Sequence, residues 1–429
     1  MSVQLSPEQA GVFELIESGR EHFFVTGRAG TGKSTLLEYL NWHTEKQIVI
    51  CAPTGVAALN VGGQTIHSLF RFPTGLIADH ELELNDAQRK LLNALDTVVI
   101  DEVSMVNADL MDAIDRALRL ARSREEPFGG AQVVLFGDPY QLPPIPPQDP
   151  GELAYLAANY ASGWFFHAKV WQEATLRVVE LREVHRQSDE RFKTLLNAVR
   201  HGQVTAEMAH ELNSMGARRP LPERDSITLA TRNDMVRRTN ERALAELPGA
   251  LASFEADLFG DWGRNLPADE RLQLKVGAQV MFLRNDSGGG SNGPRWVNGS
   301  IGEVVELGRR IVVRLGAEEF EVEPVAWEKY RYHYDSESKT LERELVAEYT
   351  QLPLRLAWAV TIHKSQGASF ERAVIDLGNG AFANGQSYVA LSRLTSLEGL
   401  YLTRPLQPRD VRVDPIVAEF MGLLLDESA

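Results

Sequence analysis

The feature that most constrains the fold of this chain is a glycine-rich turn between a short apolar strand pattern and a helix pattern. The expected strand is Phe23 to Thr26, the turn runs from Gly27 to Gly32, and the expected helix is Lys33 to Trp42. A strand that leads through a tight turn into a helix is typical of a parallel sheet with helices on its faces. The glycines let backbone N–H groups close around an anion at the positive end of the helix. The turn therefore predicts an α/β protein with an anion-binding loop.

The spacing of this turn, Gly27-x-x-x-x-Gly32-Lys33-Ser34, is that of a phosphate loop. Lys33 is expected to reach the β- and γ-phosphates of a nucleotide, and Ser34 is expected to bind Mg²⁺. The cofactors are therefore interpreted as ATP and Mg²⁺. A chance glycine-rich turn would not explain the strand, the spacing, the lysine and the serine together. The predicted nucleotide contacts of the loop are Gly27, Ala29, Gly30, Thr31, Gly32, Lys33, Ser34 and Thr35.

Two later strand ends carry polar groups that such a loop needs. The apolar run Thr97 to Ile100 ends in Asp101 and Glu102, so we assign Asp101 to magnesium and Glu102 to activation of the attacking water. A third strand, Gln132 to Phe136, leads to Gln141, whose amide can bond to the γ-phosphate or to water. An acidic pair is also a common solvated turn, and the segment around Gln141 is also compatible with a proline-rich turn. The phosphate loop upstream favours the functional interpretation of both.

Composition places the chain among soluble proteins. With 429 residues, of which 44% are hydrophobic, it can form two or three domains with their own cores. No apolar run approaches membrane-spanning length, and the polar N-terminus lacks a signal-peptide pattern. The single cysteine, Cys51, excludes an internal disulfide and fits a small buried hydrophobe in a reducing compartment. We therefore expect a cytoplasmic protein without membrane contact.

Strands and helices alternate in two sets. The first set extends to residue 180 and contains a looser segment at 71–93 that could act as a wedge, and the second begins with the expected strand Arg177 to Leu181. Between residues 272 and 353 only short strands follow one another, interrupted by the flexible loop Gly288 to Gly293, which is typical of a small inserted barrel. The predicted domains are a first α/β domain at 1–180, a second at 181–271 and 354–429, and the barrel at 272–353.

The second α/β set has no phosphate loop of its own. Two similar domains with one nucleotide site predict that ATP lies between them, with arginines of the second domain stabilising charge in the transition state. The candidates are Arg186 and Arg393. Because a single arginine is more often a surface residue, spacing alone does not select these two.

These motifs resemble superfamily-one DNA helicases, and among them the petite-integration-frequency (Pif-type) group. The segment most specific to that group is Pro127 to Gln132, which is similar to the one that separates it from RecD-type enzymes. The resemblance covers nearly the whole chain, through Leu5 to Gln9, Ala52 to Ala58, Gly63 to Ser68, Ala278 to Met281, Val297 to Gly299, Thr361 to Gly367 and Tyr388 to Arg393. It implies two RecA-like parallel-sheet domains, a wedge segment and an SH3-like β-barrel.

The resemblance also implies roles for individual residues. Gln9 would contact adenine, Gln141 would sense the γ-phosphate, and Arg186 and Arg393 would be arginine fingers. Gln366 and Gly367 would link the nucleotide state to the grip on DNA. Movement along single-stranded DNA would be 5′ to 3′, with ATP as the small-molecule substrate. The chain departs from the family pattern at Arg28, where a small residue is commoner, and at Pro139-Tyr140, which replaces an aromatic pair.

Two polar patches are the candidate contacts to DNA, one in each α/β set. A strand can be held without base recognition by hydroxyls, amides and a few cations, which reconciles DNA binding with the net charge of −15. Phe70 and Phe72 could stack on bases or pack in the core. The first patch is Pro53, Thr54, Gly55, Thr65 and His67, and the second is Thr361, His363, Lys364 and Ser365. For a lone threonine or histidine among them, a cap or a core contact is the alternative.

The resulting prediction is a monomeric ATP-dependent helicase that acts on single-stranded and on duplex or structured DNA, associated with the nucleoid if the source is a bacterium. Two alternatives stay open. One is a RecD-like helicase subunit of a repair complex, which the segment Phe128-Gly129-Gly130 disfavours. The other is an ATP-dependent switch that binds a protein partner and unwinds nothing. A small-molecule kinase would have no reason to carry the second α/β domain.

Overall fold

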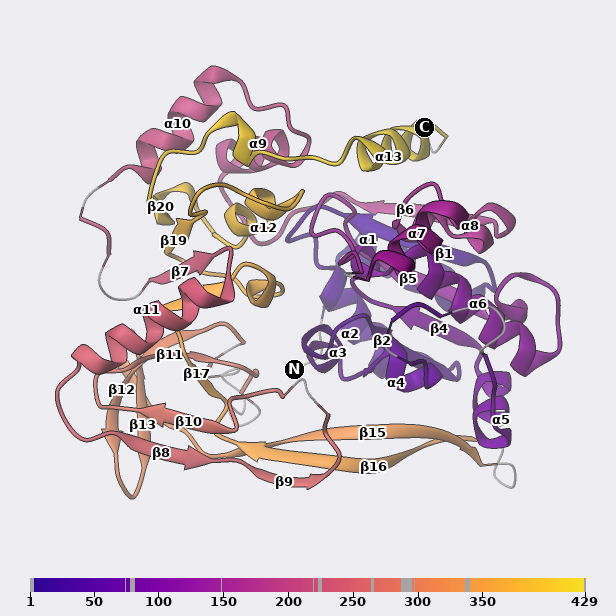
Figure 1. The fold of residues 1–429 in the computed structure, drawn as a ribbon, viewed down its shortest axis with the longest axis horizontal. Coiled ribbons are helices and arrows are strands. Elements are labelled where there is room, and N and C mark those ends of the chain that lie inside the picture. The colour runs from indigo at the N-terminus through magenta and orange to yellow at the C-terminus, as the bar shows by residue number, and fades with distance from the viewer. Residues whose placement is uncertain are drawn as a thin grey trace.

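The computed structural model describes residues 4–73, 75–77, 82–147, 149–218, 220–222, 226–263, 266–286, 295–296, 298–335 and 340–427. Figure 1 shows a parallel sheet on the right, a second one at the upper left, and antiparallel strands at the lower left. Within the described ranges, none of the helices combines the length and the apolar character that crossing a membrane requires.

The first sheet has six parallel strands in the order β3-β2-β4-β5-β1-β6. Its central strands β4 and β5 are buried along their whole length, as their unbroken apolar runs require when helices cover both faces. The strands are β1 (His22–Gly27), β2 (Ile48–Ala52), β3 (Gln64–Thr65), β4 (Thr97–Ile100), β5 (Gln132–Phe136) and β6 (Leu176–Leu181).

Strand β6 corrects one prediction. We expected Arg177 to Leu181 to open the second α/β set, but β6 pairs with β1 in the first sheet, from Leu176 opposite His22 to Leu181 opposite Gly27. The strand's side chains are mostly half-buried, as suits a sheet edge. Its pattern shows that it is a strand, but pairing with β1 decides which sheet it joins.

Eight α-helices accompany the first sheet among the described residues before β6. The group-specific segment at Pro127–Gly130 packs on α6, where the Phe128 backbone N–H donates to Asp115 Oδ1 at 2.6 Å. The helices are α1 (Pro7–Ser18), α2 (Lys33–His43), α3 (Gly55–Asn60), α4 (Ile66–Phe70), α5 (Asp86–Ala94), α6 (Ala108–Arg122), α7 (Pro150–Asn159) and α8 (Lys169–Glu173). Part of the expected wedge segment at 71–93 lies outside the described residues, and its described end belongs to α5.

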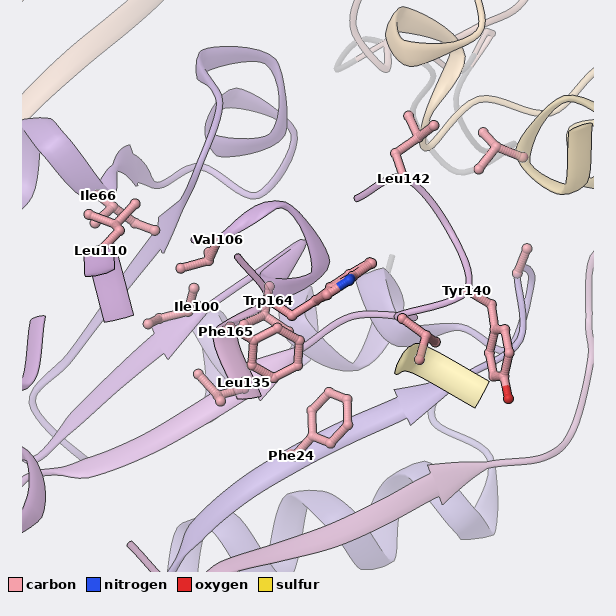
Figure 2. Close-up of a cluster of buried hydrophobic side chains, with 14 of the residues drawn as sticks. Phe24, Ile66, Ile100, Val106, Leu110, Leu135, Tyr140, Leu142, Trp164 and Phe165 are labelled. Atoms are coloured by element: carbon pink, nitrogen blue, oxygen red, sulfur yellow. The ribbon is translucent and has the colours of Figure 1, made fainter. Parts of the chain in front are cut away.

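The core of this region is aliphatic and aromatic. Figure 2 shows Phe24, Leu135 and Phe165 together, with Ile100 and Val106 nearby. Burial of this apolar surface, at roughly 25 cal/mol per Å², is the main force that holds the sheet and its helices together. Cys51 is a buried free thiol, as expected.

The second sheet has four parallel strands in the order β18-β7-β19-β20. It is β7 (Ile227–Ala230), β18 (Ala359–Thr361), β19 (Ala373–Asp376) and β20 (Leu400–Leu402), with helices α9 (Glu190–Arg200), α10 (Ala206–Gly216), α11 (Asn233–Glu246) and α12 (Gln386–Ser392). Helix α10 has no counterpart among the predicted elements. The two parallel sheets confirm the α/β fold class.

Antiparallel strands occupy the region between β7 and β18. A five-stranded sheet has the order β14-β13-β12-β11-β17, and smaller sheets are β10-β8 and β15-β16-β9. The first of these strands starts at Ala252, twenty residues before the expected barrel boundary at residue 272. The boundary and the SH3-like type of the barrel stay predictions. The strands are β8 (Ala252–Glu255), β9 (Asp257–Gly260), β10 (Arg271–Leu274), β11 (Gln279–Phe282), β12 (Ile301–Leu307), β13 (Ile311–Leu315), β14 (Glu318–Glu321), β15 (Val325–Asp335), β16 (Thr340–Gln351) and β17 (Leu354–Leu356).

The hairpin of β15 and β16 runs along the lower edge of the molecule in Figure 1 and reaches α5 of the first region. The expected strand at 320–325 is divided between the end of β14 and the start of β15. Gly288 to Gly293, the expected loop, and Val297 lie outside the described residues.

The last helix, α13 (Pro415–Glu427), follows the second sheet in sequence but packs on the first (Figure 1). The Phe420 ring stacks on Phe166 with centroids 3.8 Å apart and also contacts Phe24 and Trp171. Trp164 Nε1 donates to Asp414 Oδ2 at 2.9 Å, just before the helix. The segment 354–429 therefore does not pack as one unit with the second sheet.

Candidate nucleotide site between the two sheets

The phosphate loop lies between β1 and α2, as the sequence predicts. Gly32 precedes α2 with φ +78°, and a side chain there would collide with Gln9 Nε2. Gly30 has φ +88°, and a Cβ atom there would lie 2.7 Å from the Cβ atom of Arg186. The loop is therefore enclosed by two predicted site residues, and glycine is required for both the backbone conformation and the close approach.

Gln9 connects helix α1 to this loop. Its Nε2 donates to the Gly32 carbonyl at 3.1 Å, while its Oε1 accepts the Ser6 backbone N–H at 2.9 Å in a capping box. The side chain is buried. The contact of Gln9 with adenine stays a prediction, and its position beside the loop is compatible with that contact.

Lys33 lies at the centre of a group of charged side chains. Its Nζ donates to the Gly27 carbonyl at 2.6 Å and to the Arg28 carbonyl at 3.2 Å. Burial lowers the pKa of Lys33, and the negative charges of Asp138, Glu102 and Asp101 oppose this shift. The structure thus brings the predicted lysine and the predicted acidic pair together.

The acidic pair follows β4 directly. Burial, with repulsion from Glu102, raises the pKa of Asp101 to about 7, and burial also raises the pKa of Glu102. Glu102 has the left-handed φ of +49°, which is rare for a residue other than glycine and is often found at functional sites. Two carboxylates whose pKa values stay raised despite the nearby charges of Lys33 and Arg393 favour the arrival of a further cation.

The donors present fit a magnesium ion that arrives with a nucleotide. Among the described residues, no group of three or more His, Cys, Asp or Glu side chains could hold a metal ion by itself. Mg²⁺ in nucleotide sites takes only one or two protein ligands, and phosphates and water complete its shell. The Ser34 hydroxyl and the Asp101 carboxylate are oxygen donors of the kind that such a pair requires.

Two arginines approach the loop from the side of the second sheet. Arg186 Nη1 donates to the Ser392 carbonyl at 3.1 Å, and burial, with repulsion from Arg393, lowers the pKa of Arg186 to about 9. Burial also lowers the pKa of Arg393, and the charge of Glu102 opposes the shift. Arg186 therefore lies beside the phosphate loop, and Arg393 lies beside Glu102 of the acidic pair.

Gln141, Gln366 and Gly367 were predicted to respond to the nucleotide. Gln141 is buried, in the turn after β5, where its backbone N–H donates to the Asp138 carbonyl at 2.9 Å. The Nε2 atom of Gln366 is buried and has no hydrogen-bond partner among the described residues. Gly367 follows with φ +82°.

Sequence reasoning missed a buried cluster beside the loop. Arg200 Nη2, at the end of α9, donates to Asp138 Oδ1 at 2.9 Å, and both side chains are almost fully buried. The Tyr388 hydroxyl donates to Asp138 Oδ2 at 3.2 Å, and the Arg200 guanidinium lies 4.4 Å from the Tyr140 ring centroid. Asp138 and Tyr388 lie inside motifs that the sequence displayed, whereas nothing local marked Arg200.

The predicted DNA contacts lie near strand ends. In the first patch, Thr54 Oγ1 accepts the Ala57 N–H and Thr65 Oγ1 accepts the Ser68 N–H, so both hydroxyls cap short helices. Pro53, Gly55 and His67 in that patch are partly exposed. These residues remain candidate contacts to DNA.

The second patch is more buried. Thr361 Oγ1 accepts the Lys364 N–H at 3.3 Å, and Lys364 itself is exposed. Burial lowers the pKa of His363, which keeps its imidazole neutral near pH 7. Ser365 is fully buried and its hydroxyl donates to the Ile362 carbonyl, so we leave it out of the proposed contacts.

Phe70 and Phe72 settle one open alternative. Both rings are buried, at 1% and 7% exposure, and they stack on each other with centroids 5.2 Å apart. Neither ring presents a face on which a base could stack, because the core already covers them. The interpretation as packing residues holds for both.

A phosphate loop after β1, an acidic pair after β4 of the same sheet, and two arginines, one beside the loop and one after α12 of a second parallel sheet, define the two-sheet class of phosphate-loop proteins. A family model described as PIF1-like helicase matches residues 4–210. The ATP-dependent DNA helicase PIF1 of Homo sapiens is 37% identical, with 98% of this chain and 64% of the human protein covered. The chain thus spans somewhat less than two thirds of that relative.

Solved structures extend the comparison. Bacteroides sp Pif1 in complex with ADP-AlF4 is 34% identical, with a TM-score of 0.90 over 99% of this chain and 98% of that one. Bacteroides Pif1 bound to ssDNA has the same identity and coverage but a TM-score of 0.71. This chain belongs to the PIF1-like helicase family.

Proposed function

We propose that this protein is an ATP-dependent DNA helicase that moves 5′ to 3′ on single-stranded DNA and unwinds duplex or structured DNA. The observation that carries the proposal is the position of the half-buried Arg186 beside the phosphate loop and of the buried Arg393, after α12 of the second sheet, beside Glu102 of the acidic pair. Hydrolysis at such a junction changes the contacts between two bodies, and a motor needs that coupling.

The residues divide the chemistry among them. Lys33 and the loop amides hold the phosphates, with Gln9 beside the adenine. Ser34 and Asp101 bind Mg²⁺, which supplies charge neutralisation at the phosphates when it is bound. Glu102 orients the attacking water, Gln141 contacts the γ-phosphate, and Arg186 and Arg393 stabilise charge that develops in the transition state. Gln366 and Gly367 connect this site to the second DNA patch.

The grip on DNA rests on the two patches. Thr54, Thr65 and His67 would hold the strand on one sheet, and Thr361, His363 and Lys364 would hold it on the other. The relative from Bacteroides has structures with a nucleotide analogue and with single-stranded DNA, and this chain matches them with TM-scores of 0.90 and 0.71 at equal coverage. That difference supports a rearrangement of the parts between states. We further propose a monomer in the cytoplasm, near the nucleoid if the source is a bacterium.

The test is an unwinding assay with two duplexes that differ only in the polarity of their single-stranded tail. We expect ATP-dependent separation of the 5′-tailed duplex and little or none of the 3′-tailed one. Lys33→Ala is the control, and it should retain strand binding while it loses both hydrolysis and unwinding. Unwinding of the 3′-tailed duplex alone would reverse the proposed direction. ATP hydrolysis that single-stranded DNA does not stimulate would favour the protein-binding switch instead.

A further inference from the structure

We propose that Tyr388 is a positioning residue for ATP hydrolysis: its hydroxyl joins the phosphate loop to Asp138 and thereby sets the place of Arg393. The inference rests on the proposed function, since Arg393 is the residue through which it acts. Tyr388 lies on α12 of the second region, and its partners lie on two loops of the first.

The hydroxyl of Tyr388 makes one bond as acceptor and one as donor. The Ala29 backbone N–H of the phosphate loop donates to it at 2.9 Å, and the hydroxyl donates to Asp138 Oδ2 at 3.2 Å. The side chain is buried, at 4% exposure. Burial and the charge of Asp138 both raise the pKa of Tyr388, so the proton that makes the second bond stays on the hydroxyl. Both bonds cross from one region to the other.

Asp138 is held in turn from the second region. Its Oδ1 atom accepts from Arg200 Nη2 at 2.9 Å, and the Tyr140 backbone N–H donates to the same oxygen at 3.2 Å. The carboxylate therefore has a fixed orientation and keeps its Oδ2 atom directed at Tyr388. The hydroxyl consequently has a rigid anchor rather than a mobile one.

The start of α12 is fixed against the same loops. Gly385, the residue before the helix, has φ +72°, and a side chain there would collide with the carbonyl oxygens of Tyr140 and Gln141. Helix α12 thus contacts the turn after β5 through Gly385 and the phosphate loop through Tyr388. Two contacts along a rigid helix fix both its position and its rotation.

Arg393 follows the last residue of α12. Its Nε donates to the Val389 carbonyl at 3.1 Å, and its Nη2 donates to Ser392 Oγ at 3.1 Å, so the guanidinium is tied to the helix itself. A shift of α12 would carry the guanidinium with it. An arginine that acts only in the transition state is sensitive to such a shift, whereas ground-state binding of ATP is much less so.

The experiment is Tyr388→Phe, which removes the hydroxyl and retains the ring. Under saturating single-stranded DNA, we expect kcat for ATP to fall about 3- to 10-fold, on the scale of one hydrogen bond. KM should stay within about 2-fold, because the lost interaction acts in the transition state. In an Arg393→Ala background, single-turnover hydrolysis should show no further loss from Tyr388→Phe, because the two residues act in series.

The matched control is Tyr349→Phe in strand β16. Tyr349 is also fully buried, and its hydroxyl donates to the Ala268 carbonyl at 3.0 Å, far from the phosphate loop in sequence and in a different sheet. This variant should leave kcat and KM unchanged. An unchanged kcat in Tyr388→Phe, a rise in KM alone, or an additive effect with Arg393→Ala would each overturn the inference. If the unmodified protein shows no DNA-stimulated hydrolysis, the proposed helicase function is wrong. If the unmodified protein shows it and Tyr388→Phe behaves like the unmodified protein, only the role of Tyr388 is wrong.

Discussion

The six-stranded and the four-stranded sheets contribute to the nucleotide site in different ways. The first sheet places its residues at strand ends: the loop after β1, Asp101 and Glu102 after β4, and Asp138 after β5. The second contributes from helices and connections, with Arg200 at the end of α9 and Arg393 after α12. The first sheet therefore has a fixed, anionic site, and the second has cations whose burial depends on contact with the first.

Of the changes considered, loss of Arg393 should have the largest effect, and the quantity that it changes is the rate of ATP turnover. We expect Arg393→Ala to lower DNA-stimulated ATP turnover by about 10³-fold or more, the scale on which arginine fingers act, with ATP affinity within a small factor. Steady-state hydrolysis and nucleotide binding would measure the two quantities. Arg372→Ala, an exposed arginine beside β19, is the control and should be normal. Near-normal turnover in Arg393→Ala would assign the catalytic charge to the first sheet alone.

Breaking the ion pair between the sheets should have the next largest effect. Arg200→Ala removes the guanidinium that pairs with the buried Asp138 carboxylate, and such a change costs about 3–5 kcal/mol. Unfolding in denaturant would measure this loss as a large fall in the midpoint concentration. Arg271→Ala, whose pair with Glu255 is exposed at 63% and 65%, should change stability by about 1 kcal/mol at most. Equal effects in the two variants would contradict the dependence of the second sheet on the first.

Acid should weaken the same contact by a smaller amount. Burial alone would raise the pKa of Asp138, but the charges of Arg200 and Lys33 outweigh it and hold the pKa below its ordinary value. A carboxyl with a lowered folded pKa adds stability above its unfolded pKa of about 4, and the gain is lost as the pH falls through the folded pKa. Between about pH 5 and about pH 3, unmodified protein should lose up to about 1 kcal/mol more than Asp138→Asn, because a single proton changes stability by at most about 1.4 kcal/mol per pH unit, and the loss should continue below pH 3. If unmodified protein and Asp138→Asn lost stability equally in acid, protonation of Asp138 would not be the cause of the loss.

Sequence reasoning recovered what local chemistry determines. The phosphate loop, Lys33 and the acidic pair could be predicted because each follows its strand directly, and a few neighbouring residues define the motif. The strand boundaries of β4 and β5 were correct for the same reason, since both are short, fully buried apolar runs.

What could not be predicted depends on contacts between distant residues. Arg200 ends an ordinary amphipathic helix, and only the fold brings it to Asp138. Strand β6 has no local signal for the sheet that it joins. Phenylalanine occurs both in apolar cores and on surfaces that stack on bases, so the sequence around Phe70 and Phe72 cannot distinguish the two interpretations, whereas their burial does.

Helix α13 has a mechanical consequence. The chain leaves the first region after β6 and returns at Asp414 and Phe420, so two covalent connections, rather than one, join the second sheet to the first. A body held at two points swings most easily about the line that joins them, and other directions of travel strain one attachment. If hydrolysis moves the two regions as proposed, the Phe420 contact would act as a second fixed point and would favour rotation about a single axis.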